Sequence, residues 1–315
     1  MKNKKMRIEK DSMGSMEVPK DALYGPQTQR AVENFPISGI PFKIEFINAV
    51  IIIKRSAAIV NNNLGLLDKS IADAIVNASD TLLSGEYHDH FPVDIFQTGS
   101  GTSTNMNVNE VISRLSNNYL KQNKVHPNDH VNMGQSSNDT IPTAINISAA
   151  LMIKNQLLPS IDGLIESINK KEDEFSDIIK LGRTHLQDAT PIGLNQEFSG
   201  YKELLIKSRA KIENVHNTLK RLAQGGTAVG TGINTSIDFG HNIASEISAY
   251  TGIEFIESPN HFEAQSGQDV SIEISGLLKG LAVSLSKIAN DIRWLASGPR
   301  SGLGELNLPS VQPGS

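Results

Sequence analysis

The chain has 315 residues and a mass of 34.1 kDa, which is enough for about two domains with a substantial core. Its 29 lysines and arginines against 34 aspartates and glutamates give a net charge of -5, so electrostatics provides no reason to expect nucleic acid or an anionic membrane as a partner. Cysteine is absent, which excludes disulfides and all thiolate chemistry. Catalysis would therefore have to use hydroxyls, imidazoles, amides, carboxylates or lysines, and we expect a small ligand.

Neither a membrane span nor a secretory signal is expected. The most apolar stretch, Ile47 to Ile53, is followed by Lys54 and Arg55 and is far shorter than the roughly 20 residues that a span needs. The basic start of the chain runs into further charged residues and not into an apolar segment. We therefore expect a soluble, cytoplasmic protein.

Hydrophobic periodicity predicts a mainly α fold with few strands. Amphipathic helices are expected over residues 68–84 and 105–121, and a third helix is expected to begin near Pro142 and to reach about Leu158. The apolar stripe of the second helix is Val108, Val111, Ile112, Leu115 and Tyr119.

Two later segments, residues 194–222 and 270–295, keep an apolar residue every three or four positions over many turns. Helices of this length depend on tertiary packing, so we expect a long helix bundle. The core positions of the first are Leu194, Phe198, Tyr201, Leu205, Ile212, Val215, Leu219 and Leu222. Those of the second are Val270, Ile274, Leu277, Leu281, Leu285, Ile288, Ile292 and Leu295.

The domain organisation follows from a polar, turn-rich joint at residues 122–135. We expect an N-terminal, mixed helical domain over residues 1–133 and a central helix-bundle domain over residues 134–315.

Four polar, glycine-bearing segments lie at the ends of the expected helices, where loops commonly carry sites. They are residues 98–109, 126–140, 182–196 and 225–235. The first, TGSGTSTNMNVN, offers backbone amides and hydroxyls to an anion at a helix start, although a simple capped loop explains it as well. The second holds two histidines, which a solvated turn capped by Asp139 does not explain. In the third, Thr184 and His185 lie between two expected helices, and a lone loop histidine is often merely solvated.

The fourth segment, GGTAVGTGINT, does not match a nucleotide-binding loop. It lacks the Lys-Ser/Thr pair of a P-loop, and it follows a helix where a dinucleotide-binding turn would follow a strand. The sequence His88-Asp89-His90 lacks the partners of a metal site, so no metal is expected.

Taken in order, GSGTSTNMNVNE, HPNDHVNMGQSSND, GRTHLQDATP and GGTAVGTGINT resemble the class II fumarate hydratases of the fumarase/aspartase superfamily. The early EKDSMGSMEVP and the late NDIRWLASGPRSGLGEL are similar to the same family, so the resemblance runs from about Arg7 to Ser315. It implies a mainly α fold, a homotetramer with active sites shared between subunits, and a lyase of the tricarboxylic acid cycle. The implied reaction is the reversible hydration of fumarate to (S)-malate, without metal or organic cofactor.

The resemblance also implies roles for particular residues. The dicarboxylate would be bound by Ser100, Gly101, Thr102, Ser136, Ser137, Asn138 and Thr184. His185 would act on the water that adds or leaves, and Ser315 would be the base. A second, peripheral dicarboxylate site would be formed by His126, Pro127, Asn128 and Asp129, although Asn123 stands where some members of the family have an arginine.

Two alternatives remain open. Family members continue beyond the glycine-serine at Ser315 with a further bundle helix and a small C-terminal domain. The chain is thus expected to be incomplete and inactive alone, or to be a helical assembly subunit without activity. The other alternative is an aspartate ammonia-lyase, but those enzymes resemble GRTQLQDAVP, and this chain has His185 and Thr190 at the differing positions.

Overall fold

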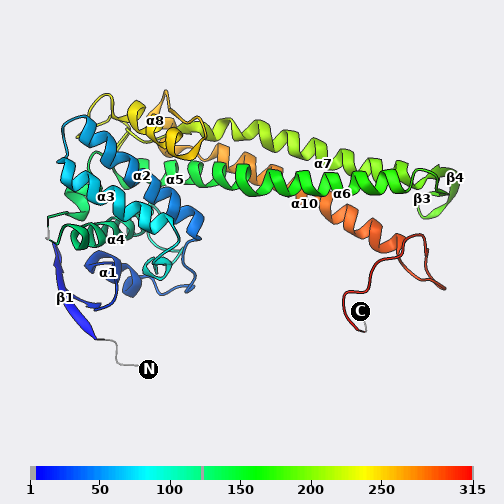
Figure 1. Ribbon diagram of the computed structural model, residues 1–315, viewed down its shortest axis with the longest axis horizontal. Helices are drawn as coiled ribbons and strands as arrows, with labels where there is room; N and C mark the ends of the chain where they lie inside the picture. Colours follow the sequence, from blue (N-terminus) through cyan, green and yellow to red (C-terminus); the bar gives the residue numbers. More distant parts are fainter. Residues whose placement is uncertain (1–4, 122–123, 314–315) are drawn as a thin grey trace. The chain divides into compact units, whose positions relative to one another are not determined.

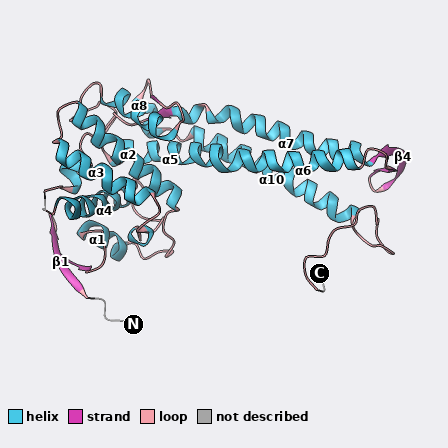
Figure 2. Cartoon of the chain, in the orientation of Figure 1, coloured by secondary structure: helices cyan, strands magenta, loops and turns pink. Residues whose placement is uncertain are grey.

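The computed structural model describes residues 5–121 and 124–313 (Figure 1). The described chain is mainly helical, as predicted, and its strands form three two-stranded sheets (Figure 2). The elements in chain order are β1 Met6–Asp11, β2 Gly14–Pro19, α1 Pro26–Asn34, α2 Ile44–Asn63, α3 Lys69–Leu83, η1 His88–His90, α4 Thr102–Leu120, η2 Pro127–Val131, α5 Ser137–Met152, η3 Ile153–Leu157, α6 Leu158–Glu174, β3 Ile179–Thr184, β4 Gln187–Gly193, α7 Leu194–His216, η4 Thr218–Lys220, β5 Arg221–Leu222, α8 Phe239–Thr251, β6 Ile256–Glu257, α9 His261–Ser266 and α10 Asp269–Leu295.

The chain divides into two compact units. The first contains residues 1–152 and 219–267, and the second contains residues 153–218 and 268–315. The boundaries between the units differ from the expected domain boundary at 133/134. Helix α5 packs against α2 and α4, so it belongs to the first unit.

Helix α2 is the centre of the first unit. It contacts α3, α4, α5 and α8, and the apolar run from Ile47 to Ile53 lies in its middle. Its residues are buried around the whole circumference, as expected for a helix that is apolar on all sides. Within the described residues, no helix is long and apolar enough to cross a membrane.

Helices α3 and α4 largely confirm the sequence prediction. Helix α4 begins three residues earlier than expected, and four of the five residues of its predicted stripe are buried. The fifth, Tyr119, is exposed, and its hydroxyl pairs with that of Thr81 at 2.7 Å.

The expected start of α5 near Pro142 is wrong. The helix begins at Ser137 and carries Pro142 inside it. The carboxylate of Asp139 accepts a hydrogen bond from the Ser136 amide and so fixes the earlier start, although Pro142 lacks the amide hydrogen that would bond to the turn before it.

The second unit is built on α6, α7 and α10. Helices α6 and α7 pack together, and the antiparallel hairpin of β3 and β4 connects them. All the predicted core positions from Leu194 to Leu222 are buried, but the helix ends at His216 and does not reach Leu222. The hydroxyl of Thr218 donates to the Val215 carbonyl at 2.6 Å, which satisfies an acceptor of the last turn.

Helix α10 packs against α7 and buries only half of its predicted core positions. The buried residues recur every seven positions, at Ile274, Leu281, Ile288 and Leu295. The other four predicted positions are half-buried or exposed, so a single chain covers only a narrow seam of this helix.

Candidate functional site

The first group of predicted ligand-binding residues lies at the start of α4. Gly101 precedes the helix with a φ of 68°, a left-handed conformation that favours glycine. A β-carbon at this position would come within 2.8 Å of the Ile141 side chain, so glycine also permits the close approach of α4 to α5. The hydroxyls of Ser100 and Thr102 lie 3.0 Å apart.

The second group lies at the start of α5. Asn138 donates from its side-chain amide to the Ala228 carbonyl at 2.7 Å. Asp139, which is fully buried, accepts from the backbone amides of Ser136, Thr227 and Gly225 at 2.9, 2.8 and 3.3 Å. The start of α5 is therefore attached to the glycine-rich loop at residues 225–235.

Two buried ionisable side chains, Asp139 and Lys54, lie below the starts of α4 and α5 in the first unit. Burial raises the pKa of Asp139 to about 6, although its backbone hydrogen bonds and the nearby Lys54 oppose the rise. Burial lowers the pKa of Lys54 to about 7, and Asp139 opposes that change. Lys54 was not singled out from the sequence, because it marks only the end of an apolar run.

Thr184 and His185 lie in the second unit, at the tip of the β3–β4 hairpin. Thr184 pairs with Gln187, so His185 and Leu186 form a two-residue turn with φ values of 51° and 62°. Both turn residues are exposed, and no described residue gives the His185 ring a hydrogen bond. Two adjacent residues with β-carbons in the left-handed region are strained, and such strain is concentrated at functional sites.

An ion-pair cluster holds the base of this hairpin. Glu305 contacts Arg183 and Lys180 at 2.6 Å each, and Lys180 also contacts Glu197 at 2.6 Å. Burial alone would raise the pKa of Glu305, but its hydrogen bonds to Arg183 and Lys180 bring the pKa below its usual value. The cluster fixes the strand that leads to His185.

The structure thus brings together two of the three predicted groups. Residues 100–102 and 136–138 adjoin within the first unit, where the side-chain amide of Asn105 reaches the Ser137 hydroxyl at 3.1 Å. Thr184 and His185 belong to the second unit. Ser315 lies outside the described residues.

The predicted peripheral site is a compact turn. Nδ1 of His126 accepts hydrogen bonds from the amides of Asn128 and Asp129 at 3.3 and 3.1 Å, which places the proton of the neutral ring on Nε2. Pro127 is the first residue of the short π-helical turn η2 that follows. Asn123 lies outside the described residues.

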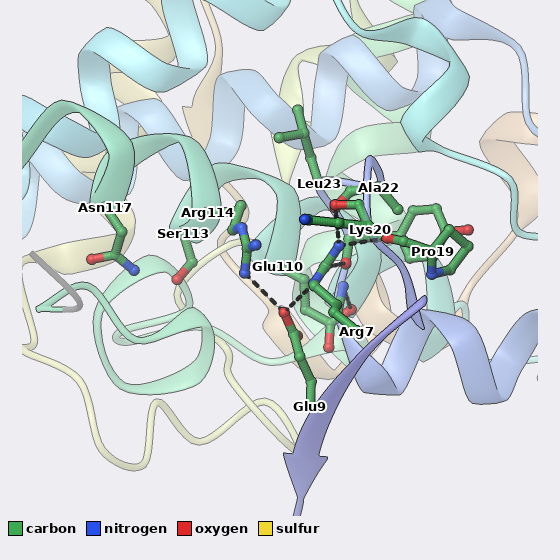
Figure 3. A network of polar contacts seen from close by, with 12 residues as sticks. Arg7, Glu9, Pro19, Lys20, Ala22, Leu23, Glu110, Ser113, Arg114 and Asn117 are labelled. Atoms are coloured by element: carbon green, nitrogen blue, oxygen red, sulfur yellow. Dashed lines mark hydrogen bonds and ion pairs between the residues drawn. The ribbon is translucent and has the colours of Figure 1, made fainter. Parts of the chain in front are cut away.

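His126, Pro127 and Asn128 line one side of a cavity of about 690 Å³ in the first unit. Figure 3 shows the polar network on another side, where Glu9 lies between Arg7 and Arg114 at 2.6 and 2.8 Å. The turn therefore borders a concave surface that carries charges of both signs.

Comparison with known proteins identifies the class. A family model described as lyase matches residues 14–315. The chain is 50% identical to the class II fumarate hydratase of Bacillus anthracis and 51% identical to that of Nitrosomonas europaea, in each case over 98% of this chain and 68% of the relative. It therefore belongs to the class II fumarate hydratase family.

Solved structures agree with this assignment. A class II fumarase from Schistosoma mansoni superposes with a TM-score of 0.96 at 38% identity, covering 99% of this chain and 70% of that one. The fumarate lyase:delta crystallin from Brucella melitensis, in native form, superposes with a TM-score of 0.92 at 40% identity, covering 99% and 71%. The predicted fold class is confirmed.

Across residues 5–121 and 124–313, no three histidine, aspartate or glutamate side chains gather closely enough to hold a metal ion, and the His88–His90 segment forms no such group. Nδ1 of His90 instead accepts a hydrogen bond from the Leu23 amide at 3.1 Å.

Proposed function

We propose that this chain catalyses the reversible hydration of fumarate to (S)-malate. The observation that carries the proposal is the cluster of hydroxyl and amide donors at the adjoining starts of α4 and α5, in a chain of the class II fumarate hydratase family. Such donors suit a dicarboxylate, because carboxylates accept several hydrogen bonds and are favoured at helix N-termini.

In the proposed complex, the two carboxylates of the substrate are bound by donors from three segments. Ser100, Gly101 and Thr102 supply the first set, and Ser136, Ser137 and Asn138 supply the second. Thr184, from the hairpin, supplies a further hydroxyl.

The chemistry needs an acid and a base on opposite sides of the double bond. In the direction of dehydration, the deprotonated oxygen of Ser315 takes the proton next to a carboxylate and becomes a hydroxyl, and the surrounding hydrogen-bond donors stabilise the negative charge that develops on the substrate. The malate hydroxyl leaves as water after it receives a proton from His185. The proposal invokes no metal and no organic cofactor.

We further propose a homotetramer in which each active site takes residues from different subunits. Helix α10 supports this, because large apolar residues outside its buried seam are exposed in the single chain. The exposed fractions of Ile272, Val283 and Trp294 are 70%, 64% and 55%. Exposed apolar residues of this size along one long helix are typical of a surface that another helix or subunit covers.

The turn at His126, Pro127, Asn128 and Asp129 is proposed as a second dicarboxylate site. Its position at the edge of the 690 Å³ cavity supports access for a small ligand. With Asn123 in place of an arginine, we expect it to bind more weakly than the main site.

Loss of fumarate's ultraviolet absorbance tests the reaction directly. Because the chain covers 68% of the length of the Bacillus anthracis relative, the assay uses the 315-residue chain and a chimera continued with the remaining residues of that relative. Malate formation that depends on His185 supports the proposal. Absence of hydration in both folded proteins would refute it.

A further inference from the structure

Lys54 is a buried amine without a carboxylate in contact. Its exposed fraction is 0%, and no described aspartate or glutamate lies within ion-pair distance of it. Its Nζ donates to Oδ1 of Asn132 at 2.8 Å and to Oε1 of Gln135 at 2.9 Å. Burying a lysine against neutral amides costs free energy, and a well-packed apolar residue would be as stable or more so. Packing alone therefore does not explain why a lysine occupies this position.

The two amides that Lys54 contacts have only one workable orientation. Asn132 donates from Nδ2 to the Gln135 carbonyl at 3.2 Å. Gln135 donates from Nε2 to the carbonyls of Val131 and Met133 at 3.1 and 3.2 Å. Both side-chain oxygens therefore point toward Nζ, which has enough hydrogens to donate to both of them whether the amine is charged or neutral.

The orientation of Asn132 determines the orientation of Asn105, which contacts Ser137 in the candidate site. Because Oδ1 of Asn132 can only accept, Asn105 must turn its Nδ2 toward it, and the two atoms lie 3.3 Å apart. The second hydrogen of the same Nδ2 points to the Ser137 hydroxyl oxygen at 3.1 Å. Ser137 thus accepts from Asn105, and its own hydrogen remains available to donate elsewhere.

We infer that Lys54 is a positioning residue that sets the hydrogen-bond direction of the chain Asn132–Asn105–Ser137, so that the Ser137 hydroxyl donates to a substrate carboxylate. The inference rests on the proposed function, in which Ser137 binds the dicarboxylate. Lys54 acts only through the two amides and touches no substrate.

Removal of the amine should leave Oε1 of Gln135 without the donor it now has, and Oδ1 of Asn132 with the Asn105 amide as its remaining donor. In Lys54→Met, Asn132 or Gln135 is then expected to rotate, and Asn105 loses the partner that fixes its orientation. Ser137 can instead donate to Asn105, which takes its hydrogen away from the substrate. Since a hydrogen bond to a charged group is involved, malate binding should weaken about 10- to 100-fold.

Isothermal titration calorimetry with malate tests this on the 315-residue chain, Lys54→Met, Ser137→Ala and the double variant. The double variant should bind no more weakly than the weaker single variant, because both changes remove the same donated hydrogen bond. Ile53→Met, at the neighbouring buried position of α2, is the packing control and should bind like the unsubstituted chain. Unchanged binding by Lys54→Met, or fully additive losses, would overturn the inference.

The absence of cysteine permits a rescue that a purely structural role would not produce. Lys54→Cys carries a single thiol, which can be alkylated in the unfolded chain before refolding. Aminoethylation restores an amine at the length of lysine, whereas propylation gives a neutral side chain of nearly the same shape. Affinity restored by the aminoethyl group alone supports the inference, and equal affinity of the two products refutes it.

A crystal structure of ligand-free Lys54→Met separates this inference from the proposed function. If neither the unsubstituted chain nor the chimera binds malate, the proposed function is what fails, and the crystal structure then decides the role of Lys54. Rotated amides at Asn132 or Gln135 together with a changed Asn105–Ser137 contact support it. An unaltered network would overturn it.

Discussion

The histidine at the hairpin tip combines a proposed chemical role with an unusual backbone conformation. His185 adopts a φ of 51°, a conformation that asparagine tolerates better than most residues. His185→Asn should therefore keep the hairpin while removing the imidazole. We expect turnover to fall about 10²-fold or more, since general acid–base groups contribute about 10²- to 10⁴-fold, with little change in the free energy of unfolding.

The matched control is His126→Asn, in the peripheral turn. This histidine accepts amide hydrogen bonds, a role that an asparagine side-chain oxygen can take over. Turnover should remain near that of the unsubstituted enzyme. A loss as large as that at His185 would mean that the two sites have been assigned the wrong way round.

The burial of Lys54 also leads to a prediction about how stability depends on pH. Its pKa is lowered by burial to about 7 from 10.5, so between these pH values the unfolded chain holds a proton that the folded chain lacks. The free energy of unfolding should therefore rise with pH across this window, and this contribution is lost as pH falls toward 7. Asp139 is the charged group that opposes the shift.

Urea unfolding of the unsubstituted chain and Lys54→Met at several pH values between about 8 and 10 measures this contribution. The slope of stability against pH should be smaller in Lys54→Met by up to about 1.4 kcal/mol per pH unit. Equal slopes would show that the folded amine holds its proton over this range.

At the scale of elements, the sequence predicted best where one chain covers the helix. The periodic positions of α7 are all buried because α6 and α10 lie against them in the same chain. The pattern in α10 is equally regular, but only the seam from Ile274 to Leu295 is covered. Periodicity reports which residues avoid water and does not say which chain covers them.

The start of α5 shows a different limit. Proline at the opening of a helix is a local rule, and it placed the start near Pro142. The actual start depends on Asp139, whose bonds to Thr227 and Gly225 join residues far apart in the sequence. Long-range hydrogen bonds of this kind leave no local pattern.

The exposed apolar residues of α10 lead to a prediction about association. Ile272, Val283 and Trp294 lie outside the buried seam and are exposed in the single chain. Val283→Lys should place a charge in the proposed subunit interface and weaken assembly, while helix content by circular dichroism is retained. Ile8→Lys, at an exposed isoleucine on β1, is the control and should leave assembly unchanged.

Light scattering at several concentrations measures both variants. The unsubstituted chain should have a mass near four times 34.1 kDa, and Val283→Lys should shift toward smaller species. A monodisperse monomer without any substitution would refute the tetramer for this chain.

For the whole molecule, composition indicated the polar segments that carry the candidate site, and only the ordered resemblance assigned roles to their residues. No periodic pattern connects Thr102, Ser137 and His185, which lie on three separate segments. One chain brings the first two together because Gly101 lets α4 approach α5. The residues beneath them, Asn105 and Lys54, appeared as ordinary members of a polar helix and of an apolar run, and only the folded contacts relate them to the site.

Shared active sites would have a consequence that no single-chain enzyme has. Ser137→Ala changes the first unit and His185→Asn changes the second, and each variant alone should have low activity. In a tetramer assembled from an equal mixture, half of the Ser137 positions and half of the His185 positions are intact. If a site draws these two residues from different subunits, random assembly should make about one quarter of the sites complete.

Hydration by the chimeric enzymes, unfolded together and refolded, should therefore recover to about one quarter of the unsubstituted rate, whereas mixing the folded variants without exchange should recover none. Activity that stays at the level of the separate variants, in mixed tetramers verified by mass, would show that each site takes both residues from one chain.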